Sequence, residues 1–158
     1  LPLLGRKSRH LNIKLQNESS GHVFSELILD GAHNVDAVNS LIATLSEWQI
    51  SCYGILLGMA KDKMTAETRD SLQKLAQQAQ QVGLVQYNST RAADPVEILQ
   101  YLELPRNSSI LLNSSQNSLR WASETTMMPW VITGSFHLLG EVLPLLSLDP
   151  CTKNLQNG

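Results

Sequence analysis

The chain has 158 residues and a mass of 17.5 kDa, and 42% of its residues are hydrophobic. This length and composition predict one domain with an ordinary core and exclude an intrinsically disordered chain. Twelve basic and fourteen acidic residues give a formal charge of -2 with no run of Lys or Arg, which argues against nucleic acid or an anionic membrane surface as a partner. The apolar runs are much shorter than the ~20 residues that a membrane span requires.

The two cysteines, Cys52 and Cys151, are too few and too far apart for a disulfide framework or a zinc site. This usage favours a reducing compartment. The opening residues 1–4 lack the order of a secretory signal. We therefore predict a cytoplasmic location, with a mitochondrial one as the alternative.

The first half of the chain alternates between strand and helix patterns. Apolar residues at every second position predict a half-buried strand over 11–15, at a sheet edge. A continuous apolar run predicts a strand buried on both faces over 23–29. Helical spacing then predicts a helix over 36–48, which Asn34 or Asp36 can cap. A buried strand over 52–57, a loop over 58–64 and a helix over 65–81 follow.

The second half continues the alternation at the spacing of βαβ units. Its predicted strands cover 84–87, 110–112 and 130–133, and its predicted helices cover 95–102, 115–124 and 135–146. This pattern predicts the α/β class: a Rossmann-like three-layer domain with a mainly parallel sheet of about six strands and one antiparallel edge strand. We predict a disordered tail over 150–158.

Polar side chains gather in three loops that follow predicted strands, over 30–34, 58–63 and 133–137. In an open parallel sheet, ligands bind outside the carboxyl ends of the strands. Asp30 can accept hydrogen bonds from ribose hydroxyls or bind a metal, although a turn or helix-cap role is commoner for such a residue. His33 can donate to a phosphate at a helix start, although a lone His is more often structural.

The other two loops offer further groups for an anion. Lys61 and Lys63 flank Asp62 and can hold a carboxylate or phosphate, or they form a surface charge cluster. Ser135 follows Gly134 at a strand-to-helix turn and can either contact an anion or cap the helix. The structural role is the commoner one for each residue alone. Their shared placement at one sheet edge favours a binding site.

Several familiar motifs do not occur in the sequence. It contains no Gly-x-Gly-x-x-Gly fingerprint, no Gly-x-x-x-x-Gly-Lys-Ser/Thr phosphate loop and no Gly-x-Ser-x-Gly elbow. A dinucleotide cofactor, an independent nucleotide hydrolase and a serine hydrolase are therefore not indicated.

Two motifs carry a family resemblance. Asp30-Gly31-Ala32-His33-Asn34 and Gly134-Ser135-Phe136-His137, with the loop 58–63 between them, resemble the carboxy-terminal domain of folylpolyglutamate synthase and dihydrofolate synthase, in the Mur ligase superfamily. The resemblance extends from about residue 4 to residue 146. It implies that residues 1–149 are the glutamate ligase domain of an ATP-dependent ligase. Such an enzyme joins L-glutamate to folate or dihydropteroate through an acyl phosphate.

The resemblance also implies what this chain lacks. In the family, the phosphate loop and the magnesium ligands belong to an amino-terminal domain, and nothing in this sequence matches them. We therefore expect this chain to be inactive alone and to depend on its own amino-terminal domain for ATP and Mg²⁺ chemistry. We expect the full-length protein to be a monomer.

Roles carry over only at matching positions. Arg6, Asp30 and His33 match ATP-binding residues, and Lys61, Ser135 and His137 fall where related ligases hold the incoming amino acid. No residue is assigned a catalytic role, and no metal ligand is expected in this chain. The sequence departs from the family pattern at Leu4, where Pro is usual, and at Met64, where Asp is usual. Two alternatives remain open: another Mur-type amino-acid ligase, or a non-catalytic nucleotide-binding module.

Overall fold

The structure is a computed structural model that describes residues 7–16, 23–125 and 128–148. Its centre is a seven-stranded sheet with the order β5-β4-β3-β6-β2-β1-β7. The five parallel strands are β2 (Val23–Asp30), β3 (Gly54–Leu57), β4 (Gln81–Val85), β5 (Ser109–Leu112) and β6 (Trp130–Thr133). Strand β1 (Ser8–Leu15) pairs antiparallel with β2, and the short strand β7 (Leu146–Ser147) pairs antiparallel with β1.

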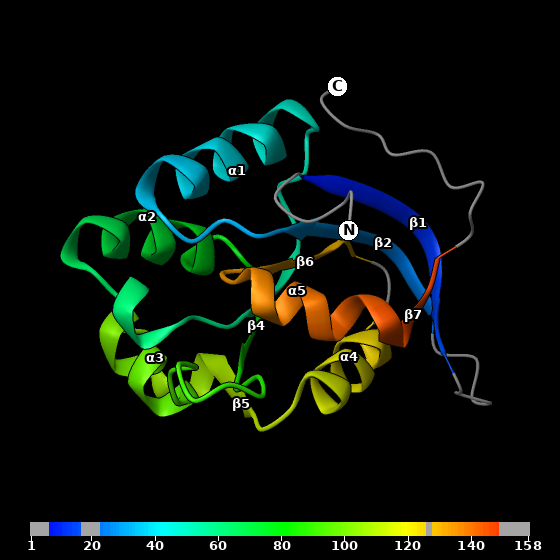
Figure 1. Ribbon diagram of the computed structural model, residues 1–158. Helices are drawn as coiled ribbons and strands as arrows, with labels where there is room; N and C mark the ends of the chain where they lie inside the picture. Colours follow the sequence, from blue (N-terminus) through cyan, green and yellow to red (C-terminus); the bar gives the residue numbers. More distant parts are fainter. Residues whose placement is uncertain (1–6, 17–22, 126–127, 149–158) are drawn as a thin grey trace.

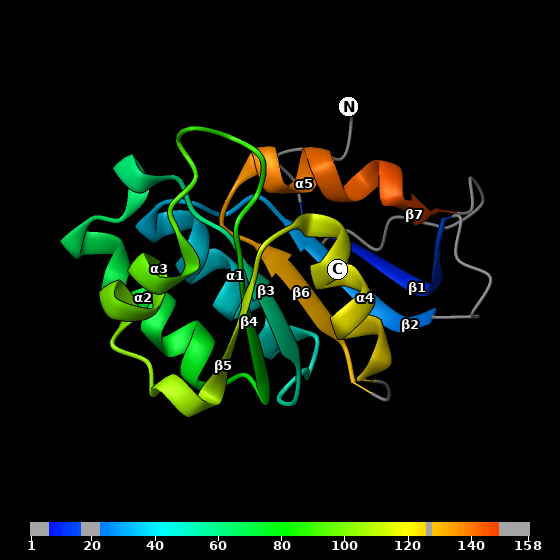
Figure 2. The ribbon, with the colours of Figure 1, turned by 90° about the horizontal axis from the view of Figure 1, so that it is seen from below.

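Helices cover both faces of the sheet, as Figures 1 and 2 show. One face packs against α1 (Val35–Glu47), α2 (Ala66–Gln77) and α3 (Pro95–Leu102), and the other against α4 (Ser115–Glu124) and α5 (Phe136–Val142). In β3, alternate residues serve the two cores, because successive side chains of a strand point to opposite faces. Ile55 and Leu57 join the first core, whereas Leu56 joins the second.

The predicted three-layer α/β class and the mainly parallel sheet are confirmed. The antiparallel strand β1 is not the outermost one, because Lys14 and Leu15 pair with the two residues of β7. The predicted helix over 135–146 ends earlier, at Val142, and a 3-10 turn (Leu143–Leu145) leads into β7. Pro144 explains this change, since it lacks the amide hydrogen that would continue the helix.

Strand β4 also lies earlier than predicted, at Gln81–Val85 instead of 84–87. The tail predicted over 150–158 lies outside the described residues. Within the described part of the chain, no helix is long and apolar enough to cross a membrane.

Side-chain caps begin the helices at the sheet edge where the parallel strands end. Of the two predicted caps for α1, Asn34 takes the role and Asp36 lies in the first turn, and Asn34 Oδ1 accepts from the Ala37 amide at 2.9 Å. Asp94 caps α3 in a capping box with Glu97, and Ser114 and Ser135 cap α4 and α5. Because these starts follow strand ends, their amide groups lie at what we call the carboxyl edge, formed by the loops after β2 to β6.

A glycine after β6 permits a close backbone approach at this edge. Gly134 has a φ of 106°, and a Cβ there would lie 2.2 Å from the Gly58 carbonyl oxygen. Position 134 therefore excludes a side chain for two reasons: the positive φ strains any residue other than glycine, and the Gly58 carbonyl leaves no room for a Cβ.

We predict that Gly134→Ala lowers the free energy of unfolding by at least about 1–3 kcal/mol, the cost of a residue held in a strained backbone region. Urea denaturation of the chain measures this. Gly140→Ala is the matched control, because a Cβ on that helical glycine meets nothing within 4 Å. Alanine there stabilises by about 0.5–1 kcal/mol through helix propensity. Equal stabilities for the two variants would contradict the account.

Candidate functional site

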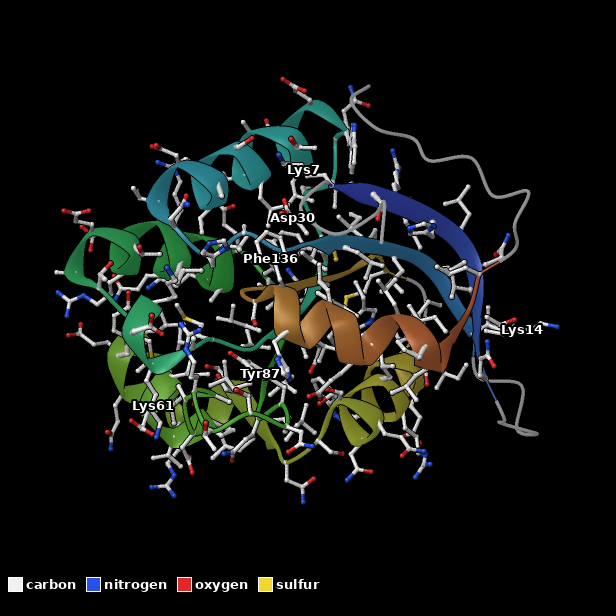
Figure 3. The ribbon with its side chains drawn as sticks, in the orientation of Figure 1. Lys7, Lys14, Asp30, Lys61, Tyr87 and Phe136 are labelled. Carbon is white, nitrogen blue, oxygen red and sulfur yellow. The ribbon has the colours of Figure 1, made fainter. Side chains whose placement is uncertain are left out.

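The loops after β2 and β6 pack directly against each other. Asp30 and Thr133 are partners in the parallel register of these strands. Phe136 covers Gly31 so closely that a Cβ at position 31 would lie 2.3 Å from its ring. The His33 ring meets Phe136 edge-on, with 5.0 Å between the ring centroids. Residues 30–34 and 134–137 therefore form one continuous surface, near the centre of the view in Figure 3.

A pocket of about 250 Å³ opens on this surface, and we call it the rim pocket. Four of its lining residues carry or can carry a positive charge: His33, Lys63, Arg91 and His137. Three others offer hydroxyl groups: Tyr87, Ser89 and Ser135. Ala60, Gly134 and Phe136 complete the lining, which contains no acidic residue. The rim pocket is therefore suited to an anionic ligand.

Asp30 lies beside the rim pocket and does not line it. Asp30 is only 6% exposed. It is therefore a buried residue at the end of β2 and does not belong to an open loop. Oδ1 accepts from the Ala32 amide at 3.0 Å, whereas Oδ2 has no hydrogen-bond partner and lies 4.0 Å from Lys7 Nζ. Burial raises the pKa of this carboxyl, against the opposing effects of Lys7, the Ala32 amide and His33. Asp30 thus holds an unused acceptor at the edge of the sheet.

The side chain of His33 is oriented by its own loop. Nδ1 lies 2.8 Å from the Gly31 carbonyl oxygen, which can only accept, so Nδ1 carries a hydrogen. The remaining nitrogen, Nε2, is the one available to a ligand. Nε2 accepts a hydrogen bond in the neutral ring and donates one in the imidazolium.

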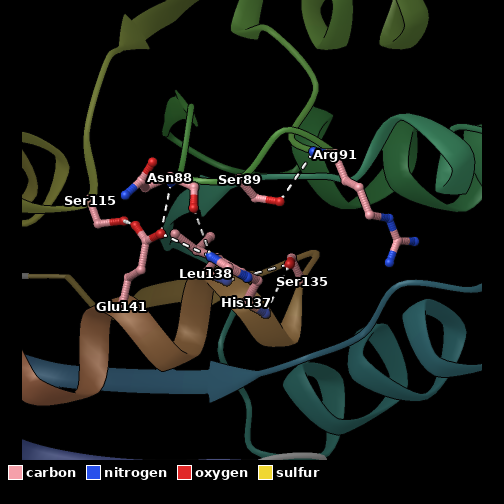
Figure 4. A network of polar contacts seen from close by, with 8 residues as sticks. All are labelled: Asn88, Ser89, Arg91, Ser115, Ser135, His137, Leu138 and Glu141. Atoms are coloured by element: carbon pink, nitrogen blue, oxygen red, sulfur yellow. Dashed lines mark hydrogen bonds and ion pairs between the residues drawn. The ribbon is translucent and has the colours of Figure 1, made fainter.

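Ser135 takes the structural role that the sequence left open. Its Oγ accepts from the amides of His137 at 3.1 Å and Leu138 at 3.4 Å, as Figure 4 shows. The hydroxyl caps α5 and still lines the rim pocket, where its hydrogen can be donated to a ligand. His137 lies one residue beyond Phe136, stacked on Tyr87 with 5.1 Å between the ring centroids.

The structure brings Lys63, and not Lys61, to the rim pocket. Residues Lys61–Lys63 form a single 3-10 turn, so the two lysines point differently. Lys61 is exposed, and Figure 3 places it away from Tyr87 and Phe136. Arg6 lies outside the described residues.

Three lining residues were missed in the sequence: Tyr87, Ser89 and Arg91, all from the connection between β4 and α3. Figure 2 shows this connection reaching toward the start of α5. Arg91 Nη2 donates to both carboxylate oxygens of Asp62, at 2.9 and 2.8 Å. Arg91 in turn lowers the pKa of that exposed carboxyl. The missed signal was the predicted strand over 84–87, whose following loop also belongs to the carboxyl edge.

No group of three or more His, Cys, Asp or Glu residues that could hold a metal ion occurs in the part of the chain that the structure describes.

Comparison with protein families gives one match. Residues 18–127 match the family described as Mur ligase, glutamate ligase domain. The chain belongs to this family. The matched range contains the loops after β2, β3 and β4 and ends before the β6–α5 turn, so Ser135 and His137 lie beyond it.

Solved structures with the same fold are folylpolyglutamate synthases at low sequence identity. The Mycobacterium tuberculosis enzyme, complexed with ADP and AMPPCP, is 20% identical with a TM-score of 0.67 over 79% of this chain. The bifunctional folylpolyglutamate synthase/dihydrofolate synthase of Yersinia pestis, complexed with AMPPNP and Mn ion, is 23% identical with a TM-score of 0.61 over 83% of this chain. The Thermotoga maritima enzyme is 21% identical with a TM-score of 0.57 over 85%.

This Mur ligase domain spans only about 30% of the length of each of the first two structures and 29% of the third. The curated protein sequences give no match to it. The structural likeness therefore establishes the fold.

We predict that Asp30→Asn makes the domain more stable than the wild type at pH 7. Burial is the largest influence on this carboxyl and disfavours its charged form, whereas Asn keeps an acceptor for the Ala32 amide without a charge. Between the ordinary pKa of 3.8 and the raised folded value, the native state holds a proton that the unfolded state has released. Wild-type stability therefore falls as pH rises through this window.

Urea midpoints at pH 7 and below pH 3.8 measure the effect, and the advantage of Asp30→Asn should shrink at the lower pH. Asp36→Asn, at an exposed acidic residue in the first turn of α1, is the control and should show no such gain. An Asp30→Asn variant that is less stable than the wild type at pH 7 would show that the Lys7 contact outweighs burial.

Proposed function

We propose that this domain is the carboxy-terminal part of an ATP-dependent ligase that adds L-glutamate to folate or dihydropteroate. The observation that carries the proposal is the joining of residues 30–34 and 134–137 at one pocket through the packing of Phe136 on Gly31. Membership of the Mur ligase family and the shared fold with folylpolyglutamate synthases support it.

The proposed reaction has two steps. A carboxylate oxygen of the folate or dihydropteroate attacks the γ-phosphorus of ATP, and the bond to the bridging oxygen breaks and releases ADP. The amino nitrogen of L-glutamate then attacks the acyl phosphate carbon, phosphate leaves with its oxygen, and the amine loses a proton. Both steps develop charge on oxygen atoms, so catalysis needs positioned donors more than a nucleophilic side chain.

We assign the nucleotide to the β2 loop. Asp30 Oδ2 is a buried acceptor without a hydrogen-bond partner, and it suits a ribose hydroxyl. The Lys7 ammonium, 4.0 Å away, would move aside when the ribose binds. His33 offers Nε2 to a phosphate at the start of α1, where the helix dipole favours negative charge. Arg6 completes the proposed nucleotide set.

We assign L-glutamate to the rim pocket. Its two carboxylates need cationic partners, and Lys63 and Arg91 line the pocket from two different loops. Ser135 and His137 add donors from the start of α5. Lys61 stays a proposed glutamate contact, although in this structure its side chain is exposed and outside the pocket lining.

When Mg²⁺ is bound, it neutralises charge on the phosphates of ATP. We place its ligands, with the phosphate loop, in an amino-terminal domain of the full-length protein. The domain described above is proposed to supply nucleotide and amino-acid contacts only, and so to be inactive alone. We also propose a monomeric full-length protein in the cytoplasm or the mitochondrion.

The test is L-glutamate-dependent ADP release by the full-length protein, with dihydropteroate, folate and a nucleotide-linked peptidoglycan precursor offered in turn as acceptors. Turnover with folate or dihydropteroate is the expected result. Turnover with the peptidoglycan precursor alone would identify another Mur-type ligase. Nucleotide binding without turnover of any acceptor would identify a binding module, and either outcome overturns the proposal.

We predict that His33→Ala in the full-length protein lowers kcat/KM for ATP by about tenfold to a hundredfold, the equivalent of one hydrogen bond to a charged group. The side chain is half-buried and makes one hydrogen bond, to the Gly31 carbonyl, and one edge contact with Phe136, so the urea midpoint should change little. Lys74→Ala removes an exposed cation at the end of α2 and is the control. Near-wild-type kcat/KM in His33→Ala would refute the nucleotide role.

A further inference from the structure

Glu141 lies behind the rim pocket, one helical turn after His137 on α5. It does not line that pocket. It lines a neighbouring hollow of about 460 Å³, outside the carboxyl ends of β4 and β5. The family resemblance and the motifs of the sequence gave this residue no role, yet its carboxylate contacts two other elements as well as His137 of its own helix.

Each carboxylate oxygen of Glu141 accepts a hydrogen bond, as Figure 4 shows. Oε2 accepts from the Asn88 amide at 2.7 Å and lies 3.2 Å from His137 Nε2. Oε1 accepts from the Ser115 hydroxyl at 2.7 Å. Glu141 therefore connects α5, the β4–α3 connection and the start of α4 at one point. Its side chain is 25% exposed, so these contacts are partly shielded from water.

These contacts determine which nitrogen of His137 carries a hydrogen. Nε2 faces two acceptors, the Asn88 carbonyl oxygen at 3.0 Å and Glu141 Oε2 at 3.2 Å. A neutral imidazole must then have its hydrogen on Nε2, so that Nδ1 is left as an acceptor. The stacked Tyr87 ring holds one face of the imidazole at 5.1 Å between centroids.

The same contacts hold the wall of the rim pocket. Both backbone groups of Asn88 are bound to α5, its amide to Glu141 and its carbonyl oxygen to His137. Tyr87 and Ser89, the residues on either side, line both the rim pocket and the neighbouring hollow, so this segment separates the two. Ser89 Oγ in turn accepts from the Arg91 amide at 3.1 Å.

We propose that Glu141 is a positioning residue for the rim pocket: it fixes the tautomer and orientation of His137 and holds residues 87–91 in the place where Ser89 and Arg91 face the ligand. Only the identity of that ligand as L-glutamate rests on the proposed function. The positioning itself rests on the hydrogen bonds of Glu141.

The first test is nuclear magnetic resonance of the 158-residue chain with labelled histidine, at a pH where imidazole is neutral. The wild type should show His137 in the Nε2–H tautomer. Glu141→Ala should weaken this preference, because only the Asn88 carbonyl oxygen would remain as an acceptor for Nε2. The Asn88 amide should exchange its hydrogen at least tenfold faster. Glu141→Gln should keep both properties, because its amide oxygen can accept from Asn88 and His137 while its NH₂ group donates to Ser115 Oγ.

Two further variants keep the test decisive. Glu47→Ala, at an exposed residue at the end of α1, is the matched control and should leave His137 and Asn88 unchanged. Ser115→Ala removes only the contact to Glu141 Oε1 and should increase the exchange rate of the Asn88 amide by a smaller factor. This variant keeps the proposal testable if Glu141→Ala does not fold. An Nε2–H tautomer and a protected Asn88 amide in both Glu141→Ala and Ser115→Ala would overturn the proposal.

The second test uses the full-length protein. Glu141→Ala should raise KM for L-glutamate about tenfold and leave KM for ATP within about twofold, with Glu141→Gln near the wild type. An equal rise in both KM values would indicate a general loss of structure and overturn the positioning role. Since the magnetic resonance test needs no turnover, an inactive full-length protein with the expected His137 signals would refute the ligase proposal and leave the positioning role standing.

Discussion

The close packing of two loops through glycine is the constraint on which the site depends. Phe136 lies on Gly31, and Gly134 approaches the carbonyl of Gly58, so the ends of β2, β6 and β3 are held together. Neither contact leaves room for a Cβ. Because β6 lies between β2 and β3 in the sheet, two motifs separated by a hundred residues meet at adjacent strand ends. The rim pocket is the space that remains between these loops and the β4–α3 connection.

The distribution of charge at this edge explains how a nearly neutral chain can present an anion site. The formal charge is only -2, yet the rim pocket has Lys63, Arg91 and two histidines and no acidic lining residue. Asp62 neutralises Arg91 from outside the pocket, in an exposed pair that an incoming carboxylate can replace at little cost. Asp30 differs, because it is buried and burial disfavours its charged form.

Much of this architecture could be predicted from the sequence, for particular physical reasons. The continuous apolar run before Asp30 and the helical spacing after Asn34 identified β2 and α1, and the alternation of such segments identified a parallel sheet. The parallel-strand rule then placed His33 and Ser135 at one edge. The proline at position 144 explains the early end of α5, and its position alone could have predicted that end.

Other features depend on tertiary contacts that no local pattern records. Lys63 faces the rim pocket because a single 3-10 turn directs it there, and neighbouring Lys61 gave an equal signal in the sequence. Arg91 lines the rim pocket, and Glu141 binds the Asn88 amide, because the β4–α3 connection packs beside α5. Burial of Asp30 likewise results from the packing around it, whereas its position after a strand suggested an open rim.

The most direct test of the central claim is a titration of the isotope-labelled chain with L-glutamate, followed by amide chemical shifts. If L-glutamate binds in the rim pocket, the shifts should gather at the carboxyl edge, at His33, Arg91 and Ser135. The groove at the opposite edge, lined by Gln49, Tyr53 and Lys74, provides the internal comparison and should stay unchanged. Shifts confined to that groove would contradict the assignment of the rim pocket as the ligand site.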